Sequence, residues 1–247
     1  MKNQLLIIYY HEVVKEVPGY SYQKIRFDHF EQEMKYLADN GYRSLHFSEL
    51  SDPIPNKSII VSFDDGFRTV YENAAPVMQK FGIKGNIYLP TDYIGQDEHF
   101  MTWNMVQELY RSGLFEMQAH THTHSDIRAL SARQLKDEIT ASDKLFQEKL
   151  GYLPPAFCMP FGVWDRRSAR ELRDMDRFRY ILGSHYGRVS GNRLSSCVLP
   201  RIGISNDDTI DVFAGKLRGA YDWKGPMQLA RLAAKNLRKE RVTRYEY

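Results

Sequence analysis

Short apolar segments alternate with amphipathic ones along this chain. Residues 4–10 and 58–63 are apolar or β-branched along almost their whole length, as is typical of strands covered on both faces. Similar segments at 86–89, 114–119, 156–159, 179–183 and 197–204 predict further strands. Between them, helical spacing predicts helices at 27–40, 68–81, 102–112, 131–150 and 165–175. In the longest helix, one apolar face is expected to contain Leu135, Ile139, Leu145 and Leu150.

Strands that alternate with helices indicate an α/β fold with a mainly parallel sheet. Polar residues directly follow four of the predicted strands, at His11, at Asp64-Asp65, at 120–124 and at 160–162. An α/β barrel gathers its active site at this end of its strands, so the placement indicates an enzyme. The chain lacks the Gly-rich motifs of Rossmann and P-loop sites and the Gly-x-Ser-x-Gly motif of serine hydrolases.

Length and charge narrow the class of protein. The 247 residues fit a single barrel domain. The 34 basic and 31 acidic residues are too balanced for a nucleic-acid binder, so we expect no nucleic-acid partner. Two cysteines, Cys158 and Cys197, do not make a disulfide framework. The first apolar segment is too short for a signal peptide, so we expect a cytoplasmic protein if Met1 is the natural start, and an extracellular one only if a signal was removed.

Two of the polar segments have the residue types of a hydrolytic metal site. Asp64-Asp65-Gly66 is either an ordinary turn or a turn that brings two carboxylates together. His120, His122 and His124 alternate, and two histidines with one carboxylate form a common catalytic zinc site. The alternative is a solvated turn, and the spacing does not decide which two histidines would bind.

The remaining segments are less specific. His11 is either a structural histidine or a catalytic one. The segment 157–162 ends in a Pro-Phe-Gly turn whose backbone N–H groups could face a ligand. Cys158 has no base near it in the sequence, which argues against a nucleophilic cysteine.

Together, residues 62–66, 120–124 and 157–162 resemble the polysaccharide deacetylase family, the NodB homology group also classified as carbohydrate esterase family 4. The motifs match over residues 58–165, with weaker similarity over 1–205. The resemblance implies a distorted (β/α)7 barrel of the NodB type and metal-dependent removal of N-acetyl groups from amino sugars. The substrate would be a polysaccharide, an oligosaccharide, or a lipid- or nucleotide-linked sugar.

The resemblance also implies roles for individual residues. Asp64 corresponds to the general base, and Asp65, His120 and His124 correspond to the ligands of a divalent metal, with zinc expected and cobalt, nickel or manganese as alternatives. His122 falls at a variable position. Phe161, with Pro160, is expected to bind the oxyanion or the substrate.

In the family's third motif an arginine usually holds the base, and here Cys158 or Met159 stands in its place. Arg201 is a candidate to orient Asp64 instead, and a structural arginine at the surface is the alternative. The opening residues 9–13 (YYHEV) resemble the bacterial poly-N-acetylglucosamine deacetylase branch, in which the acid histidine comes from the N-terminus. His11 is therefore expected to be the general acid, with His185 as the second candidate.

The end of the chain differs in composition. We expect residues 1–205 to form the barrel and 206–247 to form a C-terminal helical extension. Residues 224–247 contain seven basic and two acidic residues. Such a basic amphipathic helix either rests on an anionic membrane or packs, solvated, on the barrel. Its apolar stripe would contain Met227, Leu229, Leu232, Ala233 and Leu237.

Two other functions are kept open. One is deacylation or deformylation of another small amide. The other is a non-catalytic sugar-binding relic of the fold. The sequence does not identify the sugar, the acyl group or the oligomeric state.

Overall fold

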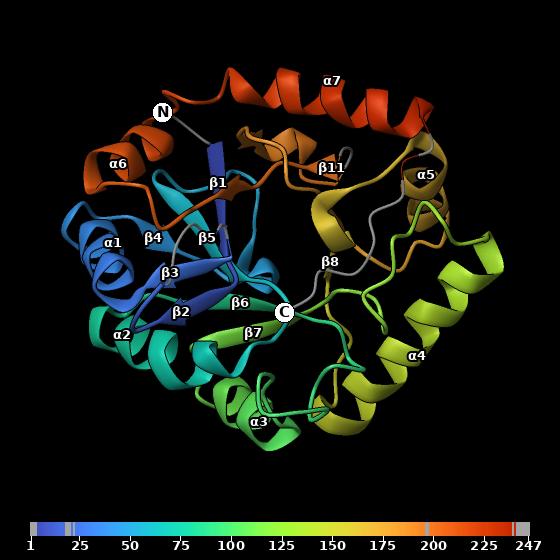
Figure 1. The fold of residues 1–247 in the computed structure, drawn as a ribbon, viewed down its shortest axis with the longest axis horizontal. Helices are drawn as coiled ribbons and strands as arrows, with labels where there is room; N and C mark the ends of the chain where they lie inside the picture. The colour runs from blue at the N-terminus through green and yellow to red at the C-terminus, as the bar shows by residue number, and fades with distance from the viewer. Residues whose placement is uncertain (1–3, 18–20, 22, 196–197, 239, 241–247) are drawn as a thin grey trace.

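A computed structural model describes residues 4–17, 21, 23–195, 198–238 and 240. A mostly parallel sheet curls into a nearly closed barrel, and helices surround it (Figure 1). Within these ranges the main parallel path has seven strands, in the order β1-β5-β6-β7-β8-β9-β11, which confirms the expected barrel. The strands of this path are β1 (Gln4–Tyr10), β5 (Ser58–Phe63), β6 (Gly85–Leu89), β7 (Phe115–Ala119), β8 (Ala156–Cys158), β9 (Tyr180–Leu182) and β11 (Val198–Leu199).

The other elements cover the outside of the barrel or extend its edges. Short strands that the sequence did not predict are β2 (Glu12–Val14), β3 (Lys24–Arg26), β4 (Arg43–Ser44) and β10 (Val189–Ser190), each too short to show an apolar pattern of its own. The helices are α1 (Phe27–Asp39), α2 (Ala75–Phe81), α3 (Trp103–Arg111), α4 (Ala132–Leu150), α5 (Arg166–Asp174), α6 (Ile210–Arg218) and α7 (Lys224–Leu237).

The last predicted strand closes the barrel in two pieces. β11 pairs with β9, and β12 (Ile202–Gly203) pairs with β1. The expectation of one continuous strand over 197–204 was therefore wrong, and residue 197 lies outside the described residues. Pro200, which has no N–H to donate to a ladder, lies in the break with Arg201. This break directs the Arg201 side chain away from the ladder and into the barrel.

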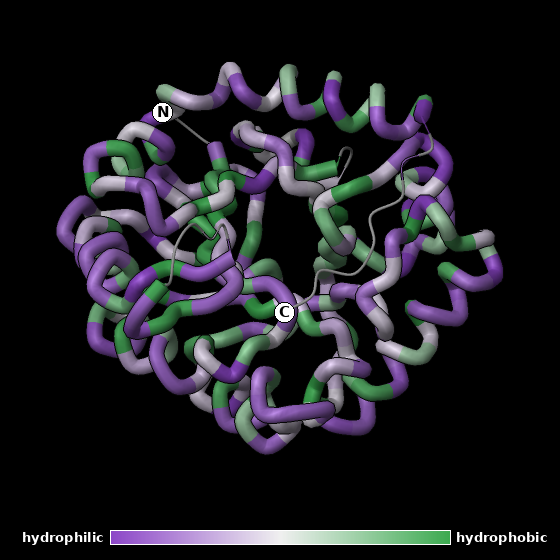
Figure 2. Tube along the Cα trace, in the orientation of Figure 1, coloured by the Kyte–Doolittle hydropathy of each residue, from purple (hydrophilic) through white to green (hydrophobic). Residues whose placement is uncertain are grey.

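Successive strand residues pack into two separate cores, because side chains alternate between the faces of a strand. On β1, Leu5 and Ile7 belong to the smaller core inside the barrel, whereas Leu6 and Ile8 belong to the larger core beneath the helices. Figure 2 shows the hydrophobic stretches gathered in the strands and hydrophilic residues along the outer helices. Both faces of the sheet are thus covered, as the continuous apolar segments predicted.

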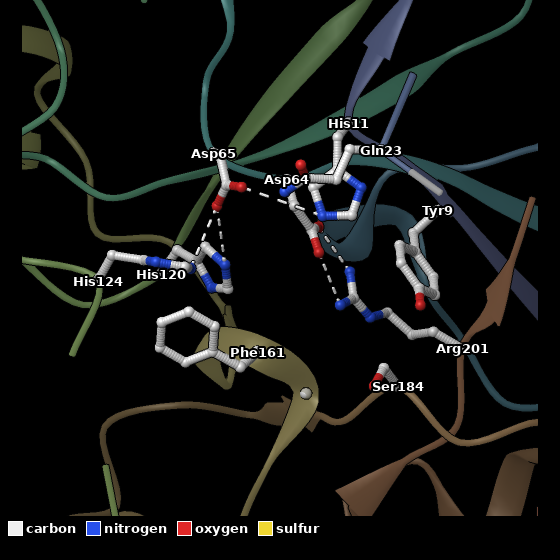
Figure 3. Close-up of a pocket in the computed structure, with 11 residues that line it drawn as sticks. Tyr9, His11, Gln23, Asp64, Asp65, His120, His124, Phe161, Ser184 and Arg201 are labelled. Carbon is white, nitrogen blue, oxygen red and sulfur yellow. Dashed lines mark hydrogen bonds and ion pairs between the residues drawn. The ribbon is translucent and has the colours of Figure 1, made fainter. Parts of the chain in front are cut away.

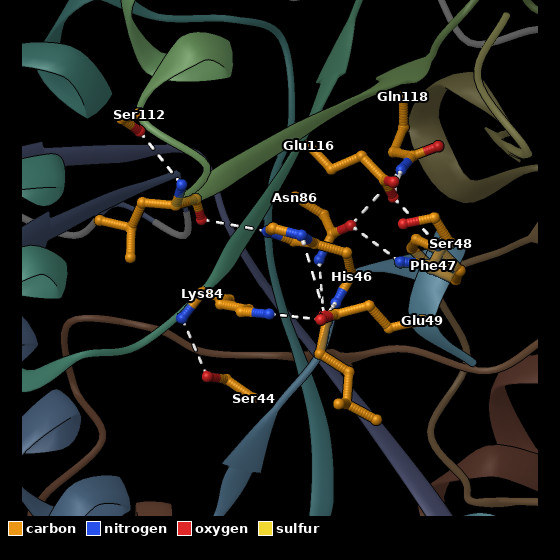
Figure 4. Close-up of polar contacts among 12 residues, drawn as sticks. Ser44, His46, Phe47, Ser48, Glu49, Lys84, Asn86, Ser112, Glu116 and Gln118 are labelled. Carbon is orange, nitrogen blue, oxygen red and sulfur yellow. Dashed lines mark hydrogen bonds and ion pairs between the residues drawn. The ribbon is translucent and has the colours of Figure 1, made fainter. Parts of the chain in front are cut away.

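Polar contacts close one end of the barrel (Figure 4). Asn86 on β6 accepts a hydrogen bond from Phe47 N at 3.4 Å, and its side-chain amide donates to Leu45 O at 3.1 Å. Gln118 on β7 accepts from Ala156 N at 3.1 Å. Leu45 and Phe47 also belong to the interior core. The segment around them therefore fills the barrel at the end opposite the predicted site.

Two helices differ from the sequence prediction. The helix expected over 68–81 has those bounds but contains a π-helical turn, Val70–Ala74, before α2. α4 has the predicted start, because the Ser131 side chain accepts from Gln134 N. Its buried face includes Phe146, whereas Leu145 and Leu150 are only half-buried. Leu150 still packs against the main core, so the expected face differs only in that Phe146 rather than Leu145 is buried on it.

The C-terminal segment packs in two ways. α6 shares the main core, where Phe213 is fully buried with its ring centroid 5.9 Å from that of Tyr36 on α1. α7 instead runs along the edge of the molecule, with Met227 47% and Leu237 86% exposed. Most of its predicted apolar stripe is therefore exposed, whereas Leu232 is half-buried and lines a groove with Trp164. None of the helices in the described ranges combines the length and apolar character that crossing a membrane requires.

Candidate active site

The residues selected from the sequence meet at one pocket of about 60 Å³ at the C-terminal ends of the strands (Figure 3). The expected base, acid, metal ligands and Arg201 line this pocket with Phe161, whereas Pro160 is buried at the start of its turn and the alternatives His122 and His185 lie outside the pocket. Tyr9, Gln23 and Ser184 line it as well. The pocket lies where the barrel architecture predicts an active site.

The Asp64-Asp65-Gly66 segment is both a turn and part of the site. Asp64 continues the ladder of β5, because its N–H donates to Tyr10 O at 3.0 Å. Asp65 then adopts a φ of 70° and so does Gly66, which turns the chain sharply. A Cβ on Gly66 would lie 2.8 Å from Ile94 Cδ1, so only glycine fits both the conformation and the space. The turn brings both carboxylates into the pocket.

Arg201 holds Asp64 from the far side of the barrel. Its Nη1 lies 2.7 Å from Asp64 Oδ1 and its Nη2 lies 2.8 Å from Oδ2. Arg201 is 1% exposed, so the alternative of a surface arginine was wrong. Its Nε donates to Gly183 O at 2.8 Å, and the Tyr9 ring centroid lies 4.4 Å from the guanidinium. This fork fixes the orientation of the carboxylate.

The charge of Asp64 follows from that pair. Burial raises the pKa of Asp64, but the Arg201 guanidinium outweighs burial and holds this pKa below its usual range. Asp64 is therefore an oriented anion at neutral pH. This is the state a general base needs before it accepts a proton.

Asp65, His120 and His124 form a candidate metal centre. The Asp65 Oδ1 atom lies 3.4 Å from His120 Nε2 and 3.2 Å from His124 Nε2. All three side chains are buried, and their ligand atoms lie within 4.8 Å of one another. Two imidazole nitrogens and one carboxylate oxygen are a donor set that suits a divalent cation and leaves coordination positions open. The residues present therefore fit such a metal.

Hydrogen bonds and burial prepare this cluster. His120 Nδ1 lies 2.8 Å from Cys158 O, which leaves Nε2 directed at the cluster. Burial lowers the pKa of His124 to about 4, so its imidazole is neutral, the form that binds metal. Burial also lowers the pKa of His120, but Cys158 and the hydrogen bond to Asp65 together raise it above its ordinary value. A bound cation would displace that proton.

His122 lies outside the cluster. Its Nδ1 contacts Thr91 Oγ1 at 2.9 Å, and its backbone N–H donates to Glu138 at 2.9 Å. The spacing alone did not separate it from His124, because Thr121 and His124 adopt φ values of 63° and 56° that interrupt the alternation of a strand. The backbone conformation decides which histidines face Asp65.

His11, the first candidate for the general acid, lines the pocket. Its Nε2 lies 4.0 Å from Asp65 Oδ2, and its ring centroid lies 5.8 Å from that of Tyr9. His185, the second candidate, does not line this pocket and faces a neighbouring groove. The geometry therefore favours His11.

The segment 160–162 forms a wall of the pocket. Phe161 adopts a φ of 59°, and its ring centroid lies 4.5 Å from that of His124. A Cβ on Gly162 would come within 1.7 Å of Ser184 Oγ, so glycine allows this turn to approach the strand end after β9. Cys158 is buried beside Asp64 and His120.

Sequence reasoning did not select Tyr9, Gln23 and Ser184. Tyr9 could have been predicted from the sequence, because it lies two residues before His11 and residues two apart on a strand share a face. Nothing in the sequence predicted Gln23 and Ser184, since they reach the pocket only through long-range packing.

The sequence is similar to those of known proteins. A family model described as polysaccharide deacetylase matches residues 51–178. The poly-beta-1,6-N-acetyl-D-glucosamine N-deacetylase of Staphylococcus aureus strain MSSA476 is 30% identical over 219 residues, covering 81% of this chain and 73% of the relative. A Bacillus subtilis protein assigned to the polysaccharide deacetylases is 30% identical over 160 residues, which are 62% of this chain and 56% of the relative.

Solved structures share the fold. A Streptococcus pyogenes deacetylase in complex with acetate superposes with a TM-score of 0.80 at 20% identity, covering 88% of this chain and 99% of that one. A Bacillus cereus polysaccharide deacetylase superposes with a TM-score of 0.78 at 24% identity, covering 87% of this chain and 69% of that one. The family match and the sequence relatives together show that this chain belongs to the polysaccharide deacetylase family.

Proposed function

We propose that this chain is a zinc-dependent hydrolase that removes the N-acetyl group from an amino sugar. One observation carries the proposal: an oriented, ionised Asp64 lies beside the Asp65, His120 and His124 cluster in a single pocket. Removing an acetyl group from nitrogen requires a group that activates water and a group that protonates the departing amine. The pocket contains candidates for both.

The mechanism assigns one task to each side chain. Asp65, His120 and His124 would hold the metal ion, which when bound polarises an acyl oxygen and lowers the pKa of water. Asp64 accepts the proton of the attacking water, and Arg201 keeps its carboxylate aimed at that water. The Phe161 backbone N–H donates to the acyl oxygen as negative charge develops on it. His11 then protonates the amine nitrogen, because an amide nitrogen leaves poorly unless it is protonated.

The size of the pocket supports an acyl substrate. The pocket is small, about 60 Å³, and has room for an acetamido group beside the Asp65, His120 and His124 cluster. The sugar would remain at the mouth of the pocket. The S. aureus relative is named for a polymer of N-acetyl-D-glucosamine, which supports a sugar substrate here.

Metal content and acetate release test the proposal together. Asp64→Asn should retain zinc but lose about 10²–10⁴-fold in turnover, the usual contribution of a general base. Asp65→Ala should lose both zinc and turnover. His122→Ala is the matched control, since His122 comes from the same segment but lies outside the cluster. Zinc without release of acetate or formate from any amino sugar would contradict the proposal and favour a binding relic.

A further inference from the structure

A second cavity adjoins the catalytic pocket. This groove has a volume of about 220 Å³ and shares Phe161, Gly162 and Ser184 with the pocket, so the two are continuous. Trp164 and His185 form its inner wall, and α7 forms the outer one. Because the two are continuous, a substrate whose acetamido group enters the pocket can extend into this groove.

α7 is held at the groove mainly by polar contacts. Gln228 accepts a hydrogen bond from Tyr186 N at 2.7 Å, and Asn236 donates to Trp164 O at 2.9 Å. Arg128 donates to Asn236 at 2.9 Å. These contacts hold both ends of the helix while leaving much of its apolar surface exposed. The helix therefore serves as a wall of the groove rather than as part of the core.

The wall that α7 contributes is positively charged. Arg231 and Lys235 lie four residues apart, on one face of the helix, and both line the groove. The described residues lining this groove include no acidic side chain. In the ranges that the structure describes, no hydrogen bond or ion pair engages either cationic group. Both side chains are exposed, so water solvates them in the free protein, and an anionic ligand in the groove would meet two cations.

The inner wall contains unsatisfied polar atoms. Trp164 Nε1 and His185 Nδ1 are buried, and neither has a hydrogen-bond partner among the described residues. Buried polar atoms are normally paired, so this wall is left with two donors or acceptors that the protein itself does not satisfy. The indole ring of Trp164 also offers a flat apolar face, and such faces stack on sugar rings and bases. The groove thus offers cations, polar groups and an aromatic face beside the reacting centre.

We propose that this groove binds a phosphate group carried by the acetamido sugar, so that the substrate is a glycosyl phosphate or diphosphate recognised by Arg231 and Lys235. This inference rests on the proposed deacetylase function and names its substrate class. Two cations match a phosphate, with a charge near −1.5 to −2, better than a single carboxylate. The phosphate could come from a nucleotide-linked or a lipid-linked sugar.

Kinetics on matched substrates test the inference. The zinc-loaded protein, Arg231→Gln/Lys235→Gln and the control Arg238→Gln are compared by acetate release. Arg238 lies at the end of α7 with its side chain 75% exposed and does not line the groove. The substrates are a neutral β-1,6-linked N-acetylglucosamine oligomer, N-acetylglucosamine 1-phosphate, UDP-N-acetylglucosamine and a polyprenyl-diphosphate-linked N-acetylglucosamine.

We expect the double variant to lose about tenfold in kcat/KM per cation on the phosphate substrates and to keep its rate on the neutral oligomer. Arg238→Gln should match the wild type throughout. A higher rate on UDP-N-acetylglucosamine than on the polyprenyl substrate would identify a nucleotide source, and the reverse a lipid source.

The inference would be overturned if the double variant and the wild type had equal kcat/KM on every phosphate substrate. Acetate release in that experiment would still support the deacetylase function. Preference for a uronate-linked N-acetylglucosamine over the phosphates would overturn it as well. If no substrate releases acetate, calorimetric binding of N-acetylglucosamine 1-phosphate still decides the role of the groove. Binding that weakens in the double variant would support it, and unchanged or undetectable binding would refute it.

Discussion

The pair of Arg201 and Asp64 gives the sharpest prediction. Arg201→Met removes the guanidinium that donates two hydrogen bonds, at 2.7 and 2.8 Å, and leaves a buried carboxylate without its cation. Breaking one side of a buried ion pair costs about 3–5 kcal/mol. A neighbouring arginine lowers the pKa of an aspartate by about 1–3 units, so its loss leaves burial unopposed and raises the pKa of Asp64.

The sign of the pH dependence follows from that shift. In the wild type the pKa of Asp64 is lowered by folding, so the pair stabilises the fold above the unfolded pKa of about 3.9 and this stability is lost in acid. In Arg201→Met the folded pKa is raised instead. The difference in unfolding free energy between the two proteins should therefore be largest near neutral pH and shrink as the pH falls towards about 4.

Two assays check this reasoning. Urea unfolding at several pH values measures the stability difference, and kcat/KM for acetate release against pH measures the ionisation of the base. The acidic limb of the kcat/KM profile should move up by about 1–3 pH units in Arg201→Met. Arg201→Lys keeps a positive charge but loses the two parallel hydrogen bonds. Its unfolding free energy and its acidic limb should therefore lie between those of the wild type and Arg201→Met. An unchanged acidic limb together with an unchanged unfolding free energy would refute the assignment of Arg201.

Three further predictions concern other parts of the molecule. His11→Ala should keep its zinc but lose about 10²–10⁴-fold in turnover, and near-normal turnover would remove His11 from the mechanism. Gly66→Ala should lower the thermal stability more than Gly113→Ala, because both glycines have a φ of 70° but only the first would bring a Cβ to 2.8 Å from a neighbour. The left-handed backbone costs about 1–2 kcal/mol for alanine in both variants, so only the steric contact distinguishes them. Equal melting temperatures of the two variants would therefore contradict the steric argument. Membrane contact through α7 stays a prediction: vesicles of anionic phospholipid should carry the wild type in flotation, and Met227→Ser/Leu237→Ser should float less. If the wild type does not float, membrane contact is wrong.

Local sequence patterns determined much of the barrel. The apolar segments of β1 and β5 predicted buried strands because continuous hydrophobic residues fit only a sheet covered on both faces. The polar residues after these strands predicted the end of the barrel at which the pocket lies. Asp65 and His120 could be selected because the motifs around them resemble a family. The pairing of β9, β11 and β12 was less clear, since strands of two or three residues have too little pattern.

Only the tertiary structure decided which side chains meet. Arg201 lies 137 residues from Asp64, and the broken strand between β11 and β12 brings it to the carboxylate only when the barrel closes. The family resemblance had already selected His124 over His122, but only the backbone conformation explains why His124 faces Asp65. The basic groove exists because α7 packs beside Trp164, far away in the sequence. Contacts of this kind depend on chain closure and packing, and a local pattern of residues does not specify them.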